Sequence, residues 1–176
     1  MTATAVIAIA VLLLGLLAWA WRNAGAERAS RPRALADAEL VYMEQLFRMR
    51  HPIRLVAKVD RVYRLPGGSL VLVELKTRHQ DRAYLTDVIQ LSAQRLAIEA
   101  QTGAVVEPYA FVSVLGPRGK LRSHRVRLLD EAALVELDRR RGAIRSGQLS
   151  PSYAASEAAC RSCGLRYKCD RFARRE

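Results

Sequence analysis

Two acidic residues and one lysine, Asp60, Glu74 and Lys76, interrupt runs of otherwise apolar, strand-like sequence. Charge in such runs is costly unless it is paired or functional. Residues 57–77 read AKVDRVYRLPGGSLVLVELKT, which is typical of two strands joined by a Pro-Gly-Gly turn. Alternation along a strand places Glu74 and Lys76 on one face. A turn centred on Gly67 would pair Asp60 with Glu74, with Cβ atoms roughly 5 Å apart.

This grouping indicates a particular chemistry. Clustered carboxylates suit Mg²⁺, which prefers oxygen ligands, retains waters and readily accepts phosphate oxygens. A nearby lysine can hold or polarise an attacking water and offset charge that develops on phosphorus. Acidic groups beside one lysine, in a chain with a net charge of +12, therefore suggest metal-assisted phosphodiester hydrolysis.

Two helices are expected on either side of this hairpin. Helical periodicity predicts a helix at 34–50, with Glu39 near the centre of its apolar face and Glu44 on its polar side. Glu39 is either a third carboxylate aimed at the hairpin or a side chain that reaches solvent at the helix edge. A second helix at 84–101 would carry a polar stripe with i, i+3, i+7 spacing, formed by Asp87, Gln90 and Gln94.

The remaining elements complete a mixed α/β core. We expect strands at 105–115 and 121–128 and a helix from Asp130 to about Ser146. The order helix, strand, strand, helix, strand, strand, helix predicts an α/β fold with a mixed sheet. The expected divisions are a transmembrane anchor at 1–21, a basic linker at 22–33, the α/β domain at 34–150 and a cysteine-containing basic tail at 151–176.

The N-terminal stretch has the composition of a membrane anchor. Residues 3–21 contain no charge and are about long enough to cross ~30 Å of hydrocarbon. Trp19 and Trp21 lie at one end, and arginines follow, which predicts a single-pass protein of the inner (cytoplasmic) membrane with its C-terminal domain in the cytoplasm. A cleaved signal peptide ending near 24–26 is the alternative, disfavoured because no Lys or Arg precedes the apolar run.

The basic charge leaves two interpretations open. Residues 118–127 contain five basic side chains and no acid. Such clusters serve either solubility and attraction to anionic lipid, or binding of a polyanion such as nucleic acid.

Asp60 followed by Glu74-Leu75-Lys76 resembles the PD-(D/E)XK nuclease superfamily, and within it the RecB-like branch with the CRISPR-associated exonucleases. That branch carries Gln-x-x-x-Tyr in the next helix; here Gln90 fills the first position and Gln94 replaces the tyrosine. The resemblance covers roughly residues 34–115 and the tail. It implies a restriction-endonuclease-like core with Mg²⁺ or Mn²⁺ bound by Asp60, Glu74, the Leu75 carbonyl and Glu39, with Lys76 serving the attacking water and Gln90 orienting the substrate or the lysine.

The only three cysteines, Cys160, Cys163 and Cys169, form a C-x₂-C-x₅-C pattern. A reducing compartment disfavours a disulfide, and closely spaced thiolates favour an iron–sulfur cluster or Zn²⁺. The resemblance implies a [4Fe–4S] cluster, which in the relatives takes a fourth cysteine ahead of the core. No upstream cysteine exists here, and His51 is the nearest candidate. A cluster, a zinc site and three metal-free thiols all remain open.

The leading hypothesis is a membrane-anchored, Mg²⁺- or Mn²⁺-dependent nuclease acting on DNA, with the lipid bilayer contacted through residues 3–21. A catalytically inactive scaffold that keeps the fold and binds nucleic acid or a membrane partner is the alternative. A membrane-bound redox protein built around the cysteines is a third hypothesis.

Overall fold

The computed structural model describes residues 9, 11–15, 25–154, 157–161, 163–164 and 166–169. The chain divides into two compact units, Met1–Glu136 and Leu137–Glu176. The second unit contains the end of α3 (Glu131–Arg145), the short helix α4 (Glu157–Arg161) and the 3₁₀ turn η2 (Arg166–Lys168).

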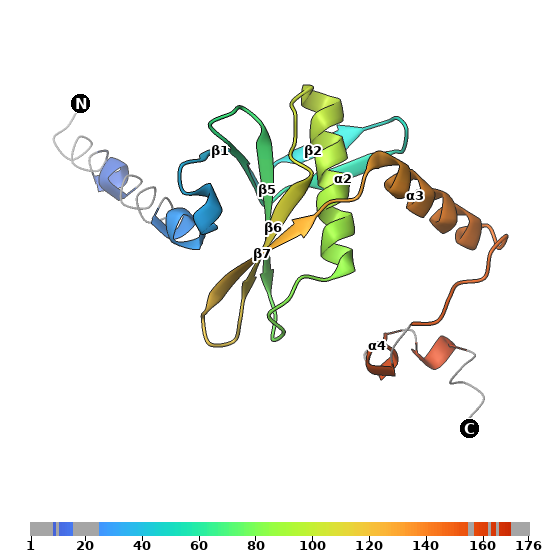
Figure 1. Cartoon of the computed structure of the whole chain (residues 1–176). Coiled ribbons are helices and arrows are strands. Elements are labelled where there is room, and N and C mark those ends of the chain that lie inside the picture. Colours follow the sequence, from blue (N-terminus) through green and yellow to red (C-terminus); the bar gives the residue numbers. More distant parts are fainter. Residues whose placement is uncertain are drawn as a thin grey trace. The chain divides into compact units, whose positions relative to one another are not determined.

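The first unit is built on a five-stranded sheet with the order β1-β4-β5-β6-β7 (Figure 1). Only β5 and β6 are parallel, and the helix α2 (Leu85–Thr102) connects them. β2 (Leu46–Met49) and β3 (Leu55–Lys58) form a separate two-stranded sheet. The five strands of the main sheet are β1 (Glu39–Met43), β4 (Arg61–Arg64), β5 (Leu70–Thr77), β6 (Tyr109–Leu115) and β7 (Leu121–Arg127).

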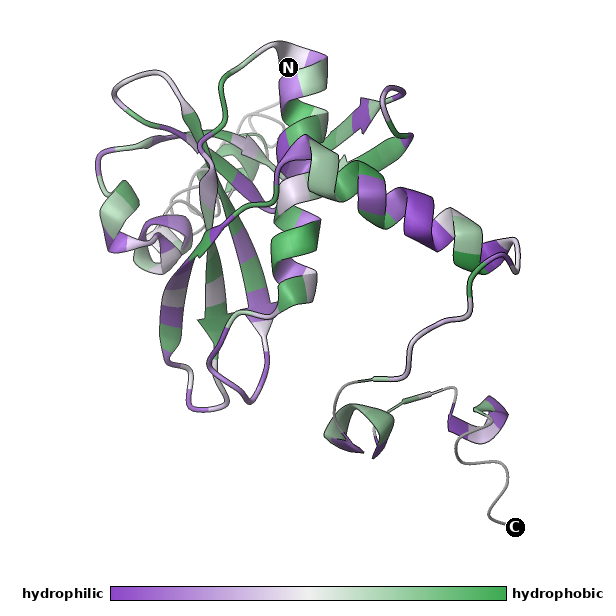
Figure 2. Ribbon diagram, turned by 45° about the vertical axis from the view of Figure 1, so that its right-hand side comes forward, coloured by the Kyte–Doolittle hydropathy of each residue, from purple (hydrophilic) through white to green (hydrophobic). Residues whose placement is uncertain are grey.

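β5 is the central strand, and both of its faces are covered. Leu70 and Leu72 join a buried cluster with Leu91 and Ile98 of α2. On the other face, Val71 and Val73 pack in a second cluster with Leu35 and Ala38, which precede β1. This two-sided burial explains the nearly continuous apolar run LVLV at the start of the strand. Figure 2 shows hydrophobic and hydrophilic residues alternating along other parts of the sheet.

The predicted hairpin register is confirmed. β4 and β5 are antiparallel, with Arg61 opposite Val73 and Arg64 opposite Leu70, the pairing expected for a turn centred on Gly67. The turn closes through the N–H of Gly68, which donates to the Leu65 carbonyl over 2.8 Å. Gly68 has a φ of 89°, a conformation that glycine adopts without a steric penalty.

The predicted helix at 34–50 is wrong. η1 (Arg33–Leu35) is a single 3₁₀ turn, and residues 39–43 and 46–49 are the strands β1 and β2. Phe47 and Met49 are buried while their neighbours are exposed, which is the period of a strand. Glu44 between the two strands has a φ of 53°, which a continuous right-handed helix excludes.

The later elements agree with expectation. α2, β7 and α3 lie within two residues of the predicted boundaries, and Asp130 caps α3 by accepting a hydrogen bond from the Ala133 N–H over 2.8 Å. β6 begins at Tyr109, because Pro108 has no N–H for the ladder. The mixed α/β class is therefore confirmed, with strands in place of the first helix.

Residues 25–30, expected to belong to a linker, are helical and fixed to the sheet. Glu27 is 8% exposed and accepts hydrogen bonds from Arg31 at 3.0 and 2.9 Å and from the Tyr63 hydroxyl at 2.6 Å. Burial raises the pKa of Glu27, but the hydrogen bonds and charges of these partners outweigh it and hold the pKa below its ordinary value. Burial and Glu27 raise the pKa of Tyr63 to about 12.

The predicted membrane anchor falls largely outside the described residues. Residues 9 and 11–15 are helical and exposed. Over the parts of the chain that the structure describes, we find no helix with both the length and the apolar character needed to cross a bilayer.

The Glu27–Tyr63 contact predicts a measurable stability change. Tyr63→Phe removes the hydroxyl that donates to a buried carboxylate. We expect the free energy of unfolding, measured in urea, to fall by about 1.5–3 kcal/mol. Because the folded pKa of Glu27 lies below 4.5, this difference should be complete above pH 4.5 and shrink as the pH falls through the lowered folded value. Tyr109→Phe, whose hydroxyl has no hydrogen bond within the described residues, is the control and should change stability by less than about 0.5 kcal/mol.

Candidate active site

Asp60 lies immediately before β4, at the point where the pairing of β4 with β5 ends. Its Oδ2 accepts a hydrogen bond from the Leu75 N–H over 2.7 Å. The carboxylate thereby takes the position of a strand carbonyl beside β5. Since the N–H and C=O of one strand residue point to the same side, the Leu75 carbonyl also faces Asp60.

Glu74 is the buried centre of the site, with 3% of its surface exposed. Its Oε1 accepts hydrogen bonds from Lys76 Nζ and Gln90 Nε2, both over 2.7 Å. Its Oε2 accepts a hydrogen bond from Gln94 Nε2 over 3.0 Å. Three donors, one of them charged, offset the cost of burying this carboxylate.

Lys76 is held by two acceptors and still reaches the surface. Its Nζ lies 2.7 Å from Glu74 Oε1 and 3.0 Å from Gln90 Oε1. Gln90 therefore accepts from the lysine and donates to the glutamate, which fixes both side chains. The Lys76 side chain is 29% exposed, so its ammonium is both oriented and accessible.

Gln94 links the site to the end of β3. Its Nε2 donates both to Glu74 Oε2 and, over 2.8 Å, to the backbone carbonyl of Lys58. The side chain is buried, and its Oε1 is one of two buried side-chain atoms of the described residues that have no hydrogen-bond partner.

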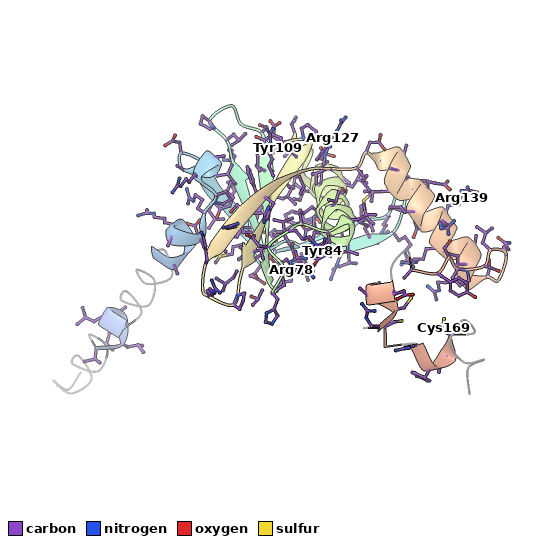
Figure 3. All side chains as sticks on the ribbon, turned by 60° about the horizontal axis from the view of Figure 1, so that its bottom comes forward. Arg78, Tyr84, Tyr109, Arg127, Arg139 and Cys169 are labelled. Carbon is purple, nitrogen blue, oxygen red and sulfur yellow. The ribbon has the colours of Figure 1, made fainter. Side chains whose placement is uncertain are left out.

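The polar face of β5 and the polar stripe of α2 match residue by residue. Arg78, the residue directly after β5, continues the alternation of Glu74 and Lys76, and its Nη2 lies 2.7 Å from Asp87 Oδ2. The Arg78 guanidinium also lies 4.7 Å from the ring centroid of Tyr84, and the two side chains are labelled in Figure 3. Two residues along the strand advance roughly 6.6 Å, and three or four residues along the helix advance roughly 4.5–6 Å. Because these distances are similar, each polar side chain of the strand face lies beside a polar side chain of α2.

A second pair of charges adjoins Asp60. Glu44 forms an ion pair with Lys58, and its N–H donates to the Asp60 carbonyl over 3.1 Å. Burial raises the pKa of the Asp60 carboxyl; the Leu75 N–H opposes this rise, and the negative charges of Glu74 and Glu44 add to it.

Glu39 does not join the site, which corrects the expectation of a further metal ligand. It lies on β1 opposite Arg64, with a 3.3 Å ion pair between Glu39 Oε2 and Arg64 Nη1. The register places Met43, at the other end of β1, opposite Arg61. Glu39 and Asp60 are therefore at opposite ends of the β1–β4 pair.

The oxygen groups fit a hard divalent cation. Asp60 Oδ1 has no hydrogen-bond donor among the described residues, Glu74 has used three of about four acceptor positions, and the Leu75 carbonyl faces Asp60. Across the described ranges, no three Asp, Glu, His or Cys side chains converge as ligands of one ion. A cation held by two carboxylates and a carbonyl would take its other ligands from water and substrate, as Mg²⁺ commonly does.

The cysteine segment receives no support as a metal site. Cys160 is buried, Cys163 is exposed and all three thiols are free. They are among the described residues, and they are not brought together as ligands of one ion. Neither an iron–sulfur cluster nor Zn²⁺ is indicated by the structure.

Sequence reasoning placed Gln94 in the polar stripe but did not assign its contacts with Glu74 and Lys58, and it missed Arg78. The stripe of Asp87, Gln90 and Gln94 was visible from its spacing, but the partner of Asp87 directly after β5 was not. Extending the alternation of Glu74 and Lys76 by one step to Arg78 would have supplied that partner.

A family model described as the PD-(D/E)XK nuclease superfamily matches residues 8–170. The crystal structure of SSO0001 is similar, with a TM-score of 0.53 and 19% identity, covering 97% of this chain and 72% of that one. A structure from Eubacterium rectale named "Putative exonuclease" has a TM-score of 0.41 and 13% identity, covering 77% of this chain and 57% of that one. No curated protein matches. The likeness to SSO0001 is one of fold, and the mixed sheet is consistent with a restriction-endonuclease-like fold.

Gln94 offers a test of how the site is held. Gln94→Met keeps the length of the side chain but leaves Glu74 Oε2 and the Lys58 carbonyl without this donor, and we expect a loss of about 1–3 kcal/mol in the free energy of unfolding. Gln45→Met makes the same change at an exposed glutamine whose side chain has no hydrogen bond within the described residues, and it should cost less than about 0.5 kcal/mol in the same urea titration. Equal costs for the two variants would show that Gln94 does not stabilise Glu74.

Proposed function

The chain belongs to the PD-(D/E)XK nuclease superfamily, and from this premise we propose that it is a divalent-metal-dependent nuclease of the RecB-like branch that hydrolyses DNA. Nucleases of the superfamily are phosphodiester hydrolases. The observation that carries the proposal is the joint hydrogen bonding of Lys76, Glu74 and Gln90 beside Asp60. The intact set of charged groups favours an enzyme over a non-cleaving scaffold.

Asp60, Glu74 and the Leu75 carbonyl would hold Mg²⁺ or Mn²⁺. When bound, such an ion polarises the phosphodiester and lowers the pKa of a coordinated water. The buried Glu74, fixed by its donors, supplies a rigid ligand. Asp60, fixed only through one oxygen, keeps the other available.

Lys76 would act on the attacking water and on the developing negative charge. An ammonium has three N–H donors, and within the described chain two of them are directed to Glu74 and Gln90. The third is available for the water or for a phosphoryl oxygen. Because Gln90 and Glu74 fix the ammonium in advance, little reorganisation accompanies the reaction.

We further propose that residues 3–21 anchor the enzyme in the inner membrane. The support is the absence of charge over this stretch and the arginines that follow it. In cell fractionation, the full-length chain should sediment with membranes and resist carbonate extraction, and a chain lacking residues 1–21 should not. Full-length, uncleaved chain in the soluble fraction would contradict the anchor.

Substitutions of Glu74 and Lys76 should separate metal binding from rate. Glu74→Ala removes a proposed ligand, and we expect loss of cleavage together with weaker Mn²⁺ binding by calorimetry. Lys76→Ala leaves both carboxylates, so Mn²⁺ binding should persist while the cleavage rate falls roughly 10²–10³-fold, the usual value of one preorganised contact. Lys168→Ala, a lysine in the second unit, is the matched control and should cleave at the wild-type rate.

Two results would contradict this assignment. Lys76→Ala that cuts single- and double-stranded DNA as fast as wild type would remove the lysine from the chemistry. Wild-type protein that binds DNA but cuts neither DNA nor RNA with Mg²⁺ or Mn²⁺ would favour the scaffold.

A further inference from the structure

The hairpin of β2 and β3 has two different faces. Phe47 and Ala57 point inward and belong to the same buried cluster as Leu91 and Ile98 of α2. The register pairs Leu46 with Lys58 and Arg48 with Val56, so these four side chains share the opposite, outward face. All four residues on that face are exposed.

The outward face carries positive charge that its own hairpin does not neutralise. Residues 46–58 contain four basic side chains, at Arg48, Arg50, Arg54 and Lys58, and no acid. Among the described residues, no carboxylate pairs with any of the three arginines of the hairpin. Elsewhere in the first unit, arginines such as Arg64, Arg78, Arg95 and Arg122 are paired with acids. Lys58 pairs with Glu44, so the three arginines are the cations of the hairpin that are free to take an external anion.

Apolar side chains are exposed between these cations. Val56 is 66% exposed and Leu46 is 49% exposed. Exposing them carries a cost that polar residues would avoid, and an apolar group amid free arginines suits a ligand that is itself part apolar and part anionic. A single nucleic-acid strand has this character, because it presents unpaired bases together with phosphates, whereas a duplex presents mainly phosphates.

The hairpin is continuous with the candidate active site. The Lys58 carbonyl accepts the hydrogen bond of Gln94, which also holds Glu74, and Asp60 follows two residues later. The Val59 N–H donates to the Gln45 carbonyl over 2.9 Å, which ties the start of β2 to the same point. A strand lying along the outward face is thus led to the proposed metal ligands.

We propose that the outward face of the β2–β3 hairpin binds single-stranded nucleic acid and leads it into the active site. This inference rests on the proposed nuclease function and adds the form of its substrate. Arg48 contacts phosphates together with Arg54, an exposed residue directly before β3, and Leu46 and Val56 contact bases. An anionic lipid surface shares part of this chemistry, but continuity with Asp60 favours a strand that is to be cut.

The test measures binding separately from cleavage. Full-length protein in detergent is titrated by fluorescence anisotropy against a labelled 20-nucleotide single strand and the matching duplex, in Ca²⁺ to suppress cutting. For the double variant Arg48→Gln, Arg54→Gln we expect single-strand affinity to fall at least tenfold. The slope of log K against log salt should become shallower by about 1.4, or about 0.7 for each lost phosphate contact. The duplex should lose less affinity.

Two companion variants identify the cause. Val56→Ser should weaken single-strand binding severalfold with no change in the salt slope, because it removes an apolar contact and no charge. The double variant Arg28→Gln, Arg33→Gln removes two exposed arginines from the segment that precedes β1, and it should retain wild-type affinity and slope.

Wild-type affinity of the Arg48→Gln, Arg54→Gln variant for the single strand would overturn the inference. So would a variant that binds phosphatidylserine vesicles more weakly than wild type but keeps its affinity for the single strand. The proposed function fails independently: wild type that binds the single strand through the hairpin but never cuts it would leave this surface in place and remove the nuclease.

Discussion

The rest of the structure depends on how one buried carboxylate is satisfied. Glu74 is almost fully enclosed between β5 and α2, and an unpaired charge there would cost several kcal/mol. Its donors come from Lys76 on its own strand and from Gln90 and Gln94 on the helix. These contacts fix the rotation of α2 about its axis and its position along β5. The hydrogen bonds that satisfy Glu74 therefore fix both the packing of α2 on β5 and the geometry of the site.

How far the sequence predicted this structure depends on how local each signal was. The turn at Pro-Gly-Gly set the hairpin register, and the alternation of side-chain direction along a strand placed Asp60 and Glu74 on one face. Their meeting was therefore predictable. The region 34–50 was not, because Tyr42, Met43, Leu46 and Phe47 fit a helical face as well as two short strands. Only pairing with β4 and packing on α2, both distant in sequence, decide between the two. Glu39 was misassigned for that reason alone.

The β2–β3 hairpin shows what this change of element means for function. A helix at 34–50 would have presented one face to the core and one to solvent, with Arg48 beside Glu44 on its polar side. As a hairpin, the same residues separate Phe47 from Arg48 by alternation, and Glu44 turns back to Lys58 near Asp60. A basic, partly apolar surface then adjoins the acids. Positive potential beside two carboxylates attracts a polyanion that the carboxylates alone would repel.

Gln94 explains how the site tolerates its departure from the expected pattern. The resemblance led to a tyrosine at this position, and a tyrosine hydroxyl has a single proton to donate. The amide Nε2 has two, and it uses them on Glu74 Oε2 and on the Lys58 carbonyl at once. One side chain thereby joins the central glutamate to the end of β3. These two hydrogen bonds connect Glu74, the proposed metal ligand, with the β2–β3 hairpin. Glutamine in place of tyrosine therefore still supports Glu74, and it also couples Glu74 to β3, the strand that leads to Asp60.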